Sequence, residues 1–254
     1  MIQLLKKLFA PRPRKAKKIN LEYAVSWDSI SRQDFREICR ILSLPNIGRE
    51  RALFLCLCAL AHIRPDDPSK YDPKAIRGKM PLIVNGETYF IGSKAIAEAC
   101  DDISFIYDST NGVPPCPLER VDRHLYDVPF DVFYTADSFI LRYAAEGSQN
   151  NTYLKEAAKQ LTGGRKRKLE PWERTALIIW WNAVKLKLAD RYPYVLKSSG
   201  TVTDRSQAEI LQDILASLNQ NRPQENEKIL KADTHSVLTA LNNVYRDADK
   251  RLSK

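Results

Sequence analysis

The residues best suited to contacting an anion form one short basic run directly after the glycine pair Gly163-Gly164: Arg165, Lys166, Arg167 and Lys168. Basic side chains are not buried without partners, so this run must face water, a carboxylate or a phosphate. The glycine pair is not a phosphate-binding loop, because the Gly-Lys-Ser/Thr of that motif does not follow it. Two interpretations stay open: a solvated loop, or a loop that contacts DNA phosphate in a ring of subunits around a channel.

Polar residues elsewhere show no catalytic spacing. The string at 122–125 partly matches a kinase catalytic loop, but its order is wrong and the downstream asparagine is missing. Acid pairs at 66–67 and 101–102 adjoin loops or helix ends, where capping roles are common. Three histidines are widely separated: His62, His124 and His235. Of these, His62 is expected to end a helix, where a cation favours the helix dipole. We expect no enzyme activity, metal site or cofactor.

The cysteines are odd in number and lack metal-ligand spacing. Most lie in apolar helical patterns, which is typical of buried thiols in a reducing compartment. They are Cys39, Cys56, Cys58, Cys100 and Cys116.

The net charge of +9 is concentrated in two places. Residues 1–18 carry seven basic side chains and no acidic one, and the run 165–168 adds four, so the remaining residues total only −2. This distribution favours local contacts over general DNA coating. The N-terminal residues form either a flexible arm or an arm that docks an apolar tip (2–9) and lays basic residues on phosphate or an acidic surface. The candidate arm contacts are Arg12, Arg14, Lys15, Lys17 and Lys18.

Targeting segments are not expected at this end, because Lys6 and Lys7 interrupt the apolar stretch and most charges follow it, the reverse of a signal peptide. No apolar run approaches the roughly 18 residues that a membrane span requires.

Apolar periodicity predicts a mainly α fold, a multi-helix bundle with one small β-hairpin at 82–91 around Asn85-Gly86. The expected helices are 31–44, 47–62, 93–107, 118–126, 130–145, 153–161, 171–192, 204–218 and 233–252, with loops at 64–80 and 108–117. We divide the chain into a basic N-terminal arm (1–20), a helical core (21–200) and a C-terminal helical docking segment (201–254). The last two helices each have one apolar stripe, so they must pack on the main domain or on another subunit. Asp137 is expected to be a paired structural carboxylate or part of a polar site.

The helix predicted at 171–192 is the longest and most apolar. Trp180 and Trp181 are adjacent and therefore point about 100° apart on a helix, so at least one must meet a second surface, which a neighbouring subunit can supply. The candidate subunit-interface residues are Trp172, Trp180, Trp181, Tyr192 and Tyr194.

Several strings resemble a family of tailed-bacteriophage structural proteins, the ring-forming head–tail connector (adaptor) proteins of the crAss-like short-tailed group. The resemblance covers roughly residues 26–200, although the 82–91 hairpin has no assigned place in it and the strings are not an active-site signature. The strings are Leu125-Tyr126-Asp127-Val128-Pro129-Phe130, Leu161-Thr162-Gly163-Gly164-Arg165-Lys166-Arg167-Lys168, Pro171-Trp172-Glu173-Arg174, Trp180-Trp181-Asn182 and Tyr192-Pro193-Tyr194-Val195.

The resemblance implies a helical virion protein that forms a ring, often of twelve copies, between the portal protein and the next tail ring or tail protein. It implies a location at the head–tail junction, assembly in the bacterial host cytoplasm, and a channel for genome passage with non-specific DNA contact. Family members often dock through an extended C-terminal segment, whereas residues 204–252 are predicted to be helical here. The alternative is a non-enzymatic DNA-binding accessory protein that uses the arm and the 165–168 loop.

Overall fold

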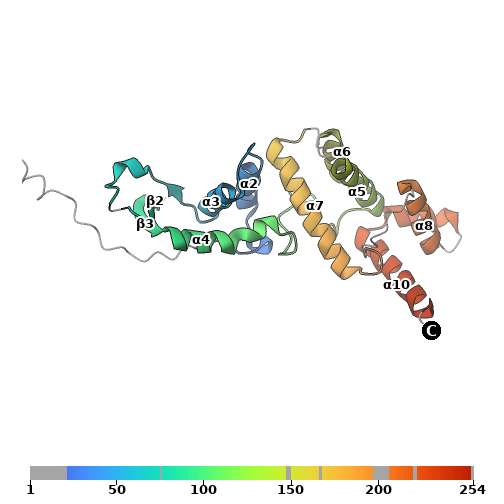
Figure 1. Ribbon diagram of the computed structural model, residues 1–254. Coiled ribbons are helices and arrows are strands. Elements are labelled where there is room, and N and C mark those ends of the chain that lie inside the picture. Colours follow the sequence, from blue (N-terminus) through green and yellow to red (C-terminus); the bar gives the residue numbers. More distant parts are fainter. Residues whose placement is uncertain are drawn as a thin grey trace, which may run out of the picture. The chain divides into compact units, whose positions relative to one another are not determined.

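A computed structural model describes residues 22–74, 76–146, 150–165, 168–196, 206–219 and 222–252 (Figure 1). The described chain is mainly helical with a small antiparallel sheet, which confirms the predicted fold class. Its internal contacts divide it into two compact units, one from residues 1–24 and 49–103 and a larger one from residues 25–48 and 104–254. The arm candidates Arg12, Arg14, Lys15, Lys17 and Lys18 lie outside the described residues.

The smaller unit packs a hairpin on two helices. Its elements are α3 (Arg49–Leu60), β1 (Arg64–Pro65), η2 (Pro68–Lys70), β2 (Lys79–Val84), β3 (Glu87–Gly92) and α4 (Ser93–Asp102). The sheet order is β1-β2-β3, and both pairings are antiparallel. Asn85 and Gly86 have φ values of 50° and 82°, the left-handed pair that a type I′ turn requires, which confirms the predicted hairpin. Strand β1 lies in the stretch predicted as a loop.

The end of α3 explains the place of His62. The His62 N–H donates to the Ala59 carbonyl (3.2 Å) and the Ile63 N–H donates to the Cys58 carbonyl (2.9 Å). These two bonds form a Schellman motif, and His62 takes its left-handed position with φ 51°. His62 therefore ends the helix, as predicted.

Asp66 joins the loop after β1 to the sheet. Its Oδ1 accepts from Lys70 Nζ (2.8 Å), and its Oδ2 accepts from the hydroxyls of Tyr71 (2.5 Å) and Thr88 (3.1 Å). The Lys70 ammonium, followed by the Tyr71 hydroxyl, holds the pKa of this carboxyl well below its usual range. The charged form of Asp66 is therefore the form that stabilises this unit.

Replacing Asp66 with asparagine is expected to loosen the hairpin at neutral pH, because the amide cannot replace a carboxylate that accepts from three side chains. Amide hydrogen exchange of β2 and β3 should accelerate roughly tenfold. In the unsubstituted protein the stabilisation is complete above the ordinary carboxyl pKa, near pH 4, and is lost as the pH falls towards the lowered folded pKa.

The control is Glu98→Gln, which removes an exposed carboxylate that lies 3.7 Å from Lys94. Equal exchange rates in Asp66→Asn and Glu98→Gln would show that the Asp66 contacts do not hold the hairpin.

The larger unit contains the remaining helices. They are η1 (Trp27–Ser29), α2 (Arg32–Leu42), α5 (Phe130–Ala145), α6 (Thr152–Leu161), α7 (Pro171–Arg191), α8 (Gln207–Asn219), η4 (Pro223–Glu225), α9 (Asn226–Lys231) and α10 (Thr234–Leu252), and η3 (Ile103–Tyr107) spans the boundary between the units. The long helix α7 packs against α2, and α5 packs against α6 (Figure 1). Helix α9 was not predicted, because six residues are too few to show a helical period.

The predicted helix at 118–126 is wrong. Leu118 and Leu125 are buried at helix-like spacing, but Arg120 and Leu125 have φ values of 60° and 66° and the segment is a series of turns. The Asp122 carboxylate accepts the N–H groups of His124 (2.8 Å) and Tyr126 (3.1 Å). Side-chain hydrogen bonds thus replace the backbone bonds of a helix.

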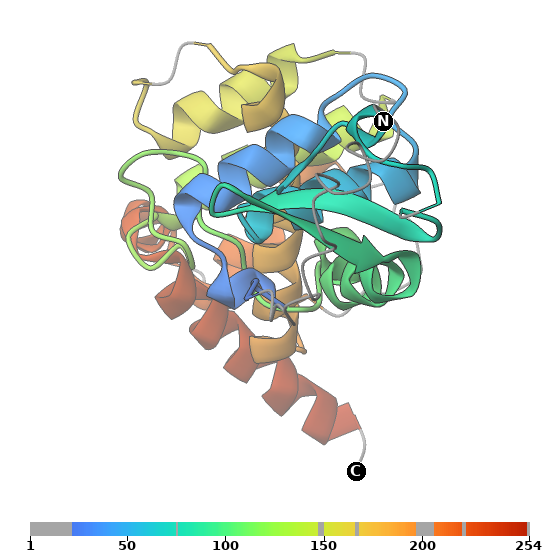
Figure 2. The same ribbon diagram turned by 90° about the vertical axis from the view of Figure 1, so that its left-hand side faces the viewer.

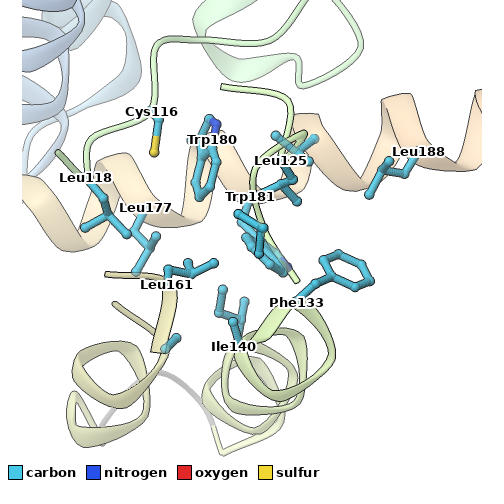
Figure 3. Close-up of a cluster of buried hydrophobic side chains, with 14 of the residues drawn as sticks. Cys116, Leu118, Leu125, Phe133, Ile140, Leu161, Leu177, Trp180, Trp181 and Leu188 are labelled. Atoms are coloured by element: carbon cyan, nitrogen blue, oxygen red, sulfur yellow. The ribbon is translucent and has the colours of Figure 1, made fainter. Parts of the chain in front are cut away.

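The core of the larger unit is built around the two adjacent tryptophans of α7 (Figure 3). Trp180 is 0% exposed and donates from Nε1 to the Arg123 carbonyl (2.9 Å). Trp181 is 1% exposed, stacks on Phe133 with a centroid distance of 5.6 Å, and donates from Nε1 to Asp137 Oδ1 (2.9 Å). The two side chains do meet different surfaces, and both surfaces belong to the same unit.

Asp137 is a paired carboxylate of this core. Besides the Trp181 indole, its Oδ2 accepts from Lys185 Nζ at 2.7 Å, which selects the structural alternative of the two predicted for it.

No disulfide joins the cysteines, all of which lie in the described part of the chain. Burial raises the pKa of Cys56 to about 12, of Cys58 to about 11 and of Cys116 to about 12. These thiols therefore stay protonated and unreactive at neutral pH.

Candidate functional site

The basic run follows a tightly closed helix end. Gly163 (φ 60°) and Gly164 (φ 83°) end α6, and the Gly164 N–H donates to the Lys159 carbonyl (2.7 Å). Arg165 is exposed, and the exposed Lys168 lies 3.2 Å from a Glu170 carboxylate oxygen. Of the four residues predicted to face DNA, these two are at the surface, while Lys166 and Arg167 lie outside the described residues. An exposed ion pair such as Lys168–Glu170 is weak, so the Lys168 ammonium remains available to an anion.

Helix α7 begins directly after this run. The Glu170 N–H donates to the Glu173 carboxylate (2.8 Å), and Pro171 occupies the first turn. The capping fixes the position of the exposed cations Arg165 and Lys168 near the start of α7.

The aromatic residues predicted for a subunit interface fall into two groups. Trp180, Trp181 and Tyr192 are buried in the larger unit, so their side chains offer no surface to a neighbour. The sequence pattern indicated a second packing surface but not whether the same chain supplies it. Trp172 is half-buried with the Arg36 guanidinium 4.9 Å above its ring, and Tyr194 is 38% exposed. Only these last two remain on the surface.

The C-terminal helices pack on the larger unit at their beginning. Thr234 donates from its N–H (3.0 Å) and its hydroxyl (2.7 Å) to the Val128 carbonyl, and the Phe130 N–H donates to the Ala232 carbonyl (2.9 Å). The first half of α10 buries Val237, Leu238 and Leu241 in the main core cluster. The stretch predicted as a docking segment thus packs on the main domain with this half.

The second half of α10 is different. A heptad-like series with spacings of four and three continues along the whole helix: Thr234, Leu238, Leu241, Tyr245, Ala248 and Leu252. The first three are buried and Tyr245 is half-buried, but every residue from 247 to 252 is exposed. Leu252 is 88% exposed and Val244 is 39% exposed. In Figure 2 the end of this red helix points away from the other helices of its unit.

A concavity of about 380 Å³ lies beside the end of α7. It is lined by His124, Tyr126, Val184, Lys187, Leu188, Asp190, Arg191 and His235. These residues come from the 118–126 turns, from α7 and from the start of α10. The grouping brings together two histidines that are 111 residues apart in the sequence.

His235 holds the wall of this concavity through both ring nitrogens. Its Nε2 lies 2.8 Å from the His124 carbonyl oxygen, which can only accept, so Nε2 carries a proton. Its Nδ1 lies 2.8 Å from the Tyr192 hydroxyl, which donates to it in the neutral imidazole. The Tyr126 ring stacks on this imidazole with a centroid distance of 4.2 Å and an interplanar angle of 22°. Tyr126 and His235 therefore form a fixed aromatic wall.

Arg191 lies at the rim against this wall. Its Nη1 donates to the Tyr126 hydroxyl oxygen at 2.8 Å, and its guanidinium carbon is 5.8 Å from the Tyr126 ring centroid. Sequence reasoning missed this site, because its residues come from three distant segments and one of those segments was predicted as a helix. The pair Leu125-Tyr126 drew attention only through the family resemblance.

Within the described ranges, no group of three or more histidine, cysteine or acidic residues is placed to hold a metal ion. Among the helices that the structure describes, none has the length and apolarity to cross a bilayer. Comparisons with protein-family models, curated proteins and solved structures found no match.

Proposed function

We propose that this chain is a structural virion protein, a head–tail connector that oligomerises as a ring beneath the portal, joins capsid to tail and lines the channel for DNA passage. The proposal follows the resemblance of strings such as Pro171-Trp172-Glu173-Arg174 to connector proteins. Its partners are further copies of itself, twelve in the ring, the portal protein, and the next tail ring or tail protein.

The observation that carries the proposal is the uncovered end of α10. An amphipathic helix of this length gains most of its stability from packing its apolar stripe, and the last two turns have nothing packed on Leu252. A ring or portal contact supplies the missing surface. Imaging purified virions tests the proposal: density for this chain at the portal vertex is expected, and its absence there would refute a connector role.

The alternative is a non-enzymatic DNA-binding accessory protein that uses the basic arm and the 165–168 loop. The exposed Arg165 and Lys168 favour it as much as they favour a channel lining. A free DNA-binding protein should bind duplex without a portal and with a steep salt dependence, whereas a connector should form a ring on its portal.

Replacing Arg165, Lys166, Arg167 and Lys168 together with glutamine tests the phosphate contact common to both proposals. If each cation neutralises one phosphate, the slope of log affinity against log salt should fall by about 0.9 for each phosphate that is no longer neutralised. Duplex binding in a salt series measures this for the isolated protein, and retention of packaged DNA measures it in virions.

A matched control neutralises Lys228 and Lys231 on α9, which are exposed and paired with Glu225 and Glu227. The phosphate contact is wrong if the 165–168 variant keeps the affinity and salt slope of the unsubstituted chain.

A further inference from the structure

We propose that the concavity beside the end of α7 binds a carboxylate carried by a partner polypeptide, next to an apolar side chain of that partner. This site goes beyond the connector proposal and does not depend on it. Its charged rim and apolar lining fit the end of a peptide chain or an acidic side chain.

The rim provides two cations for the carboxylate. Lys187 and Arg191 are one helical turn apart on α7, and both line the concavity. Within the described chain neither forms an ion pair, and the one hydrogen bond of the Arg191 guanidinium goes to Tyr126. Its remaining N–H groups are therefore open to a bidentate carboxylate.

The wall is fixed before any ligand arrives. Tyr126 is held by its stack on His235 and by the Arg191 hydrogen bond. His235 is in turn held by Tyr192 and by the His124 carbonyl. A site whose aromatic wall and guanidinium are already ordered loses less conformational entropy on binding.

The lining also selects the rest of the ligand. Val184 and Leu188 add aliphatic surface below the aromatic wall, so the cavity combines apolar floor and cationic rim. A volume of about 380 Å³ admits one or two side chains. A hydrophobic residue that carries or adjoins a carboxylate fits both features.

The charge balance favours a carboxylate over a phosphate. Asp190 lines the same concavity, so the rim carries one net positive charge when both histidines are neutral. One net positive charge matches a monoanion and repels part of a phosphate dianion. A DNA backbone is moreover a convex ridge, whereas these groups converge in a hollow.

The test uses the full chain and three small probes: N-acetyl-phenylalanine, its uncharged amide, and inorganic phosphate. Calorimetry or ligand-observed NMR should give a dissociation constant on the order of 1 mM for the carboxylate, as expected of so small a ligand. The amide and phosphate should bind at least about tenfold more weakly, because one lacks the charge and the other meets Asp190.

Three variants locate the binding. Arg191→Gln should weaken the carboxylate roughly tenfold, and Asp190→Asn should strengthen it, so a general loss of folding cannot imitate the result. Arg174→Gln changes a cation on the same helix outside the concavity and should have no effect. Equal binding of acid and amide, tighter binding of phosphate, or an unchanged Arg191→Gln would each overturn the proposal. Virion imaging tests the connector role separately.

Discussion

Replacing Trp181 with alanine is expected to destabilise the larger unit by about 3–5 kcal/mol, the range for removing a buried large aromatic side chain. The residue is 1% exposed, and its ring lies between Phe133 and Trp180, with centroid distances of 5.6 and 5.7 Å. Removing it empties the centre of the core (Figure 3) and leaves Asp137 without its indole donor. Urea denaturation followed by circular dichroism measures the loss, and hydrogen exchange of α5 and α7 assigns it to this unit.

A second variant separates shape from hydrogen bonding. Trp181→Phe keeps much of the ring volume but removes the N–H, so the loss should fall to about 1–2 kcal/mol, the cost of an unmade bond at a partly buried carboxylate. Lys185 remains 2.7 Å from Asp137 and limits the cost.

The matched control is Trp172→Ala. Trp172 is half-buried and the Arg36 guanidinium lies over its ring, so we expect a loss of about 1 kcal/mol or less. If Trp181→Ala left stability unchanged but abolished assembly, the core assignment would be wrong and the interface role predicted from the sequence would be restored.

The contrast between these two tryptophans shows what local sequence could predict. Adjacent residues on a helix diverge by about 100°, so two packing surfaces for Trp180 and Trp181 followed from the sequence. Which molecule supplies the second surface depends on tertiary contacts between residues 44 and 57 positions apart, which periodicity does not encode.

The same distinction applies to the turns around Asp122. The spacing of Leu118 and Leu125 imitates a helix, because a buried irregular segment also directs apolar residues inward at intervals. The Asp122 side-chain bonds that determine the turns cannot be read from apolar periodicity. The hairpin was predictable, by contrast, because Asn85-Gly86 determines its own backbone conformation locally.

The candidate sites divide in the same way. The exposure of Arg165 and Lys168 follows from charge alone, so the sequence predicted it. The concavity at Tyr126, Arg191 and His235 requires three distant segments to converge, and no local pattern marks it.

The second large effect is expected at the end of α10. Changing Val244 and Leu252 together to aspartate should reduce assembly on the portal at least about 100-fold, since two apolar anchors are replaced by charges that the contact would have to desolvate. The melting temperature of the isolated chain should change by no more than about 2 °C, because both residues are exposed and surface substitutions are usually mild. Sedimentation or light scattering with purified portal measures assembly, and circular dichroism measures the fold.

Asn243→Asp is the matched control, because it adds a negative charge to the same part of α10 at an exposed position beside the apolar series. It should assemble normally. A fall in melting temperature in the double variant would mean that the apolar stripe packs within the chain. Normal assembly of the double variant would mean that the partner lies elsewhere on the surface. Loss of assembly with an intact fold is the one result in which the buried first half of α10 anchors the helix and its exposed second half binds the neighbour.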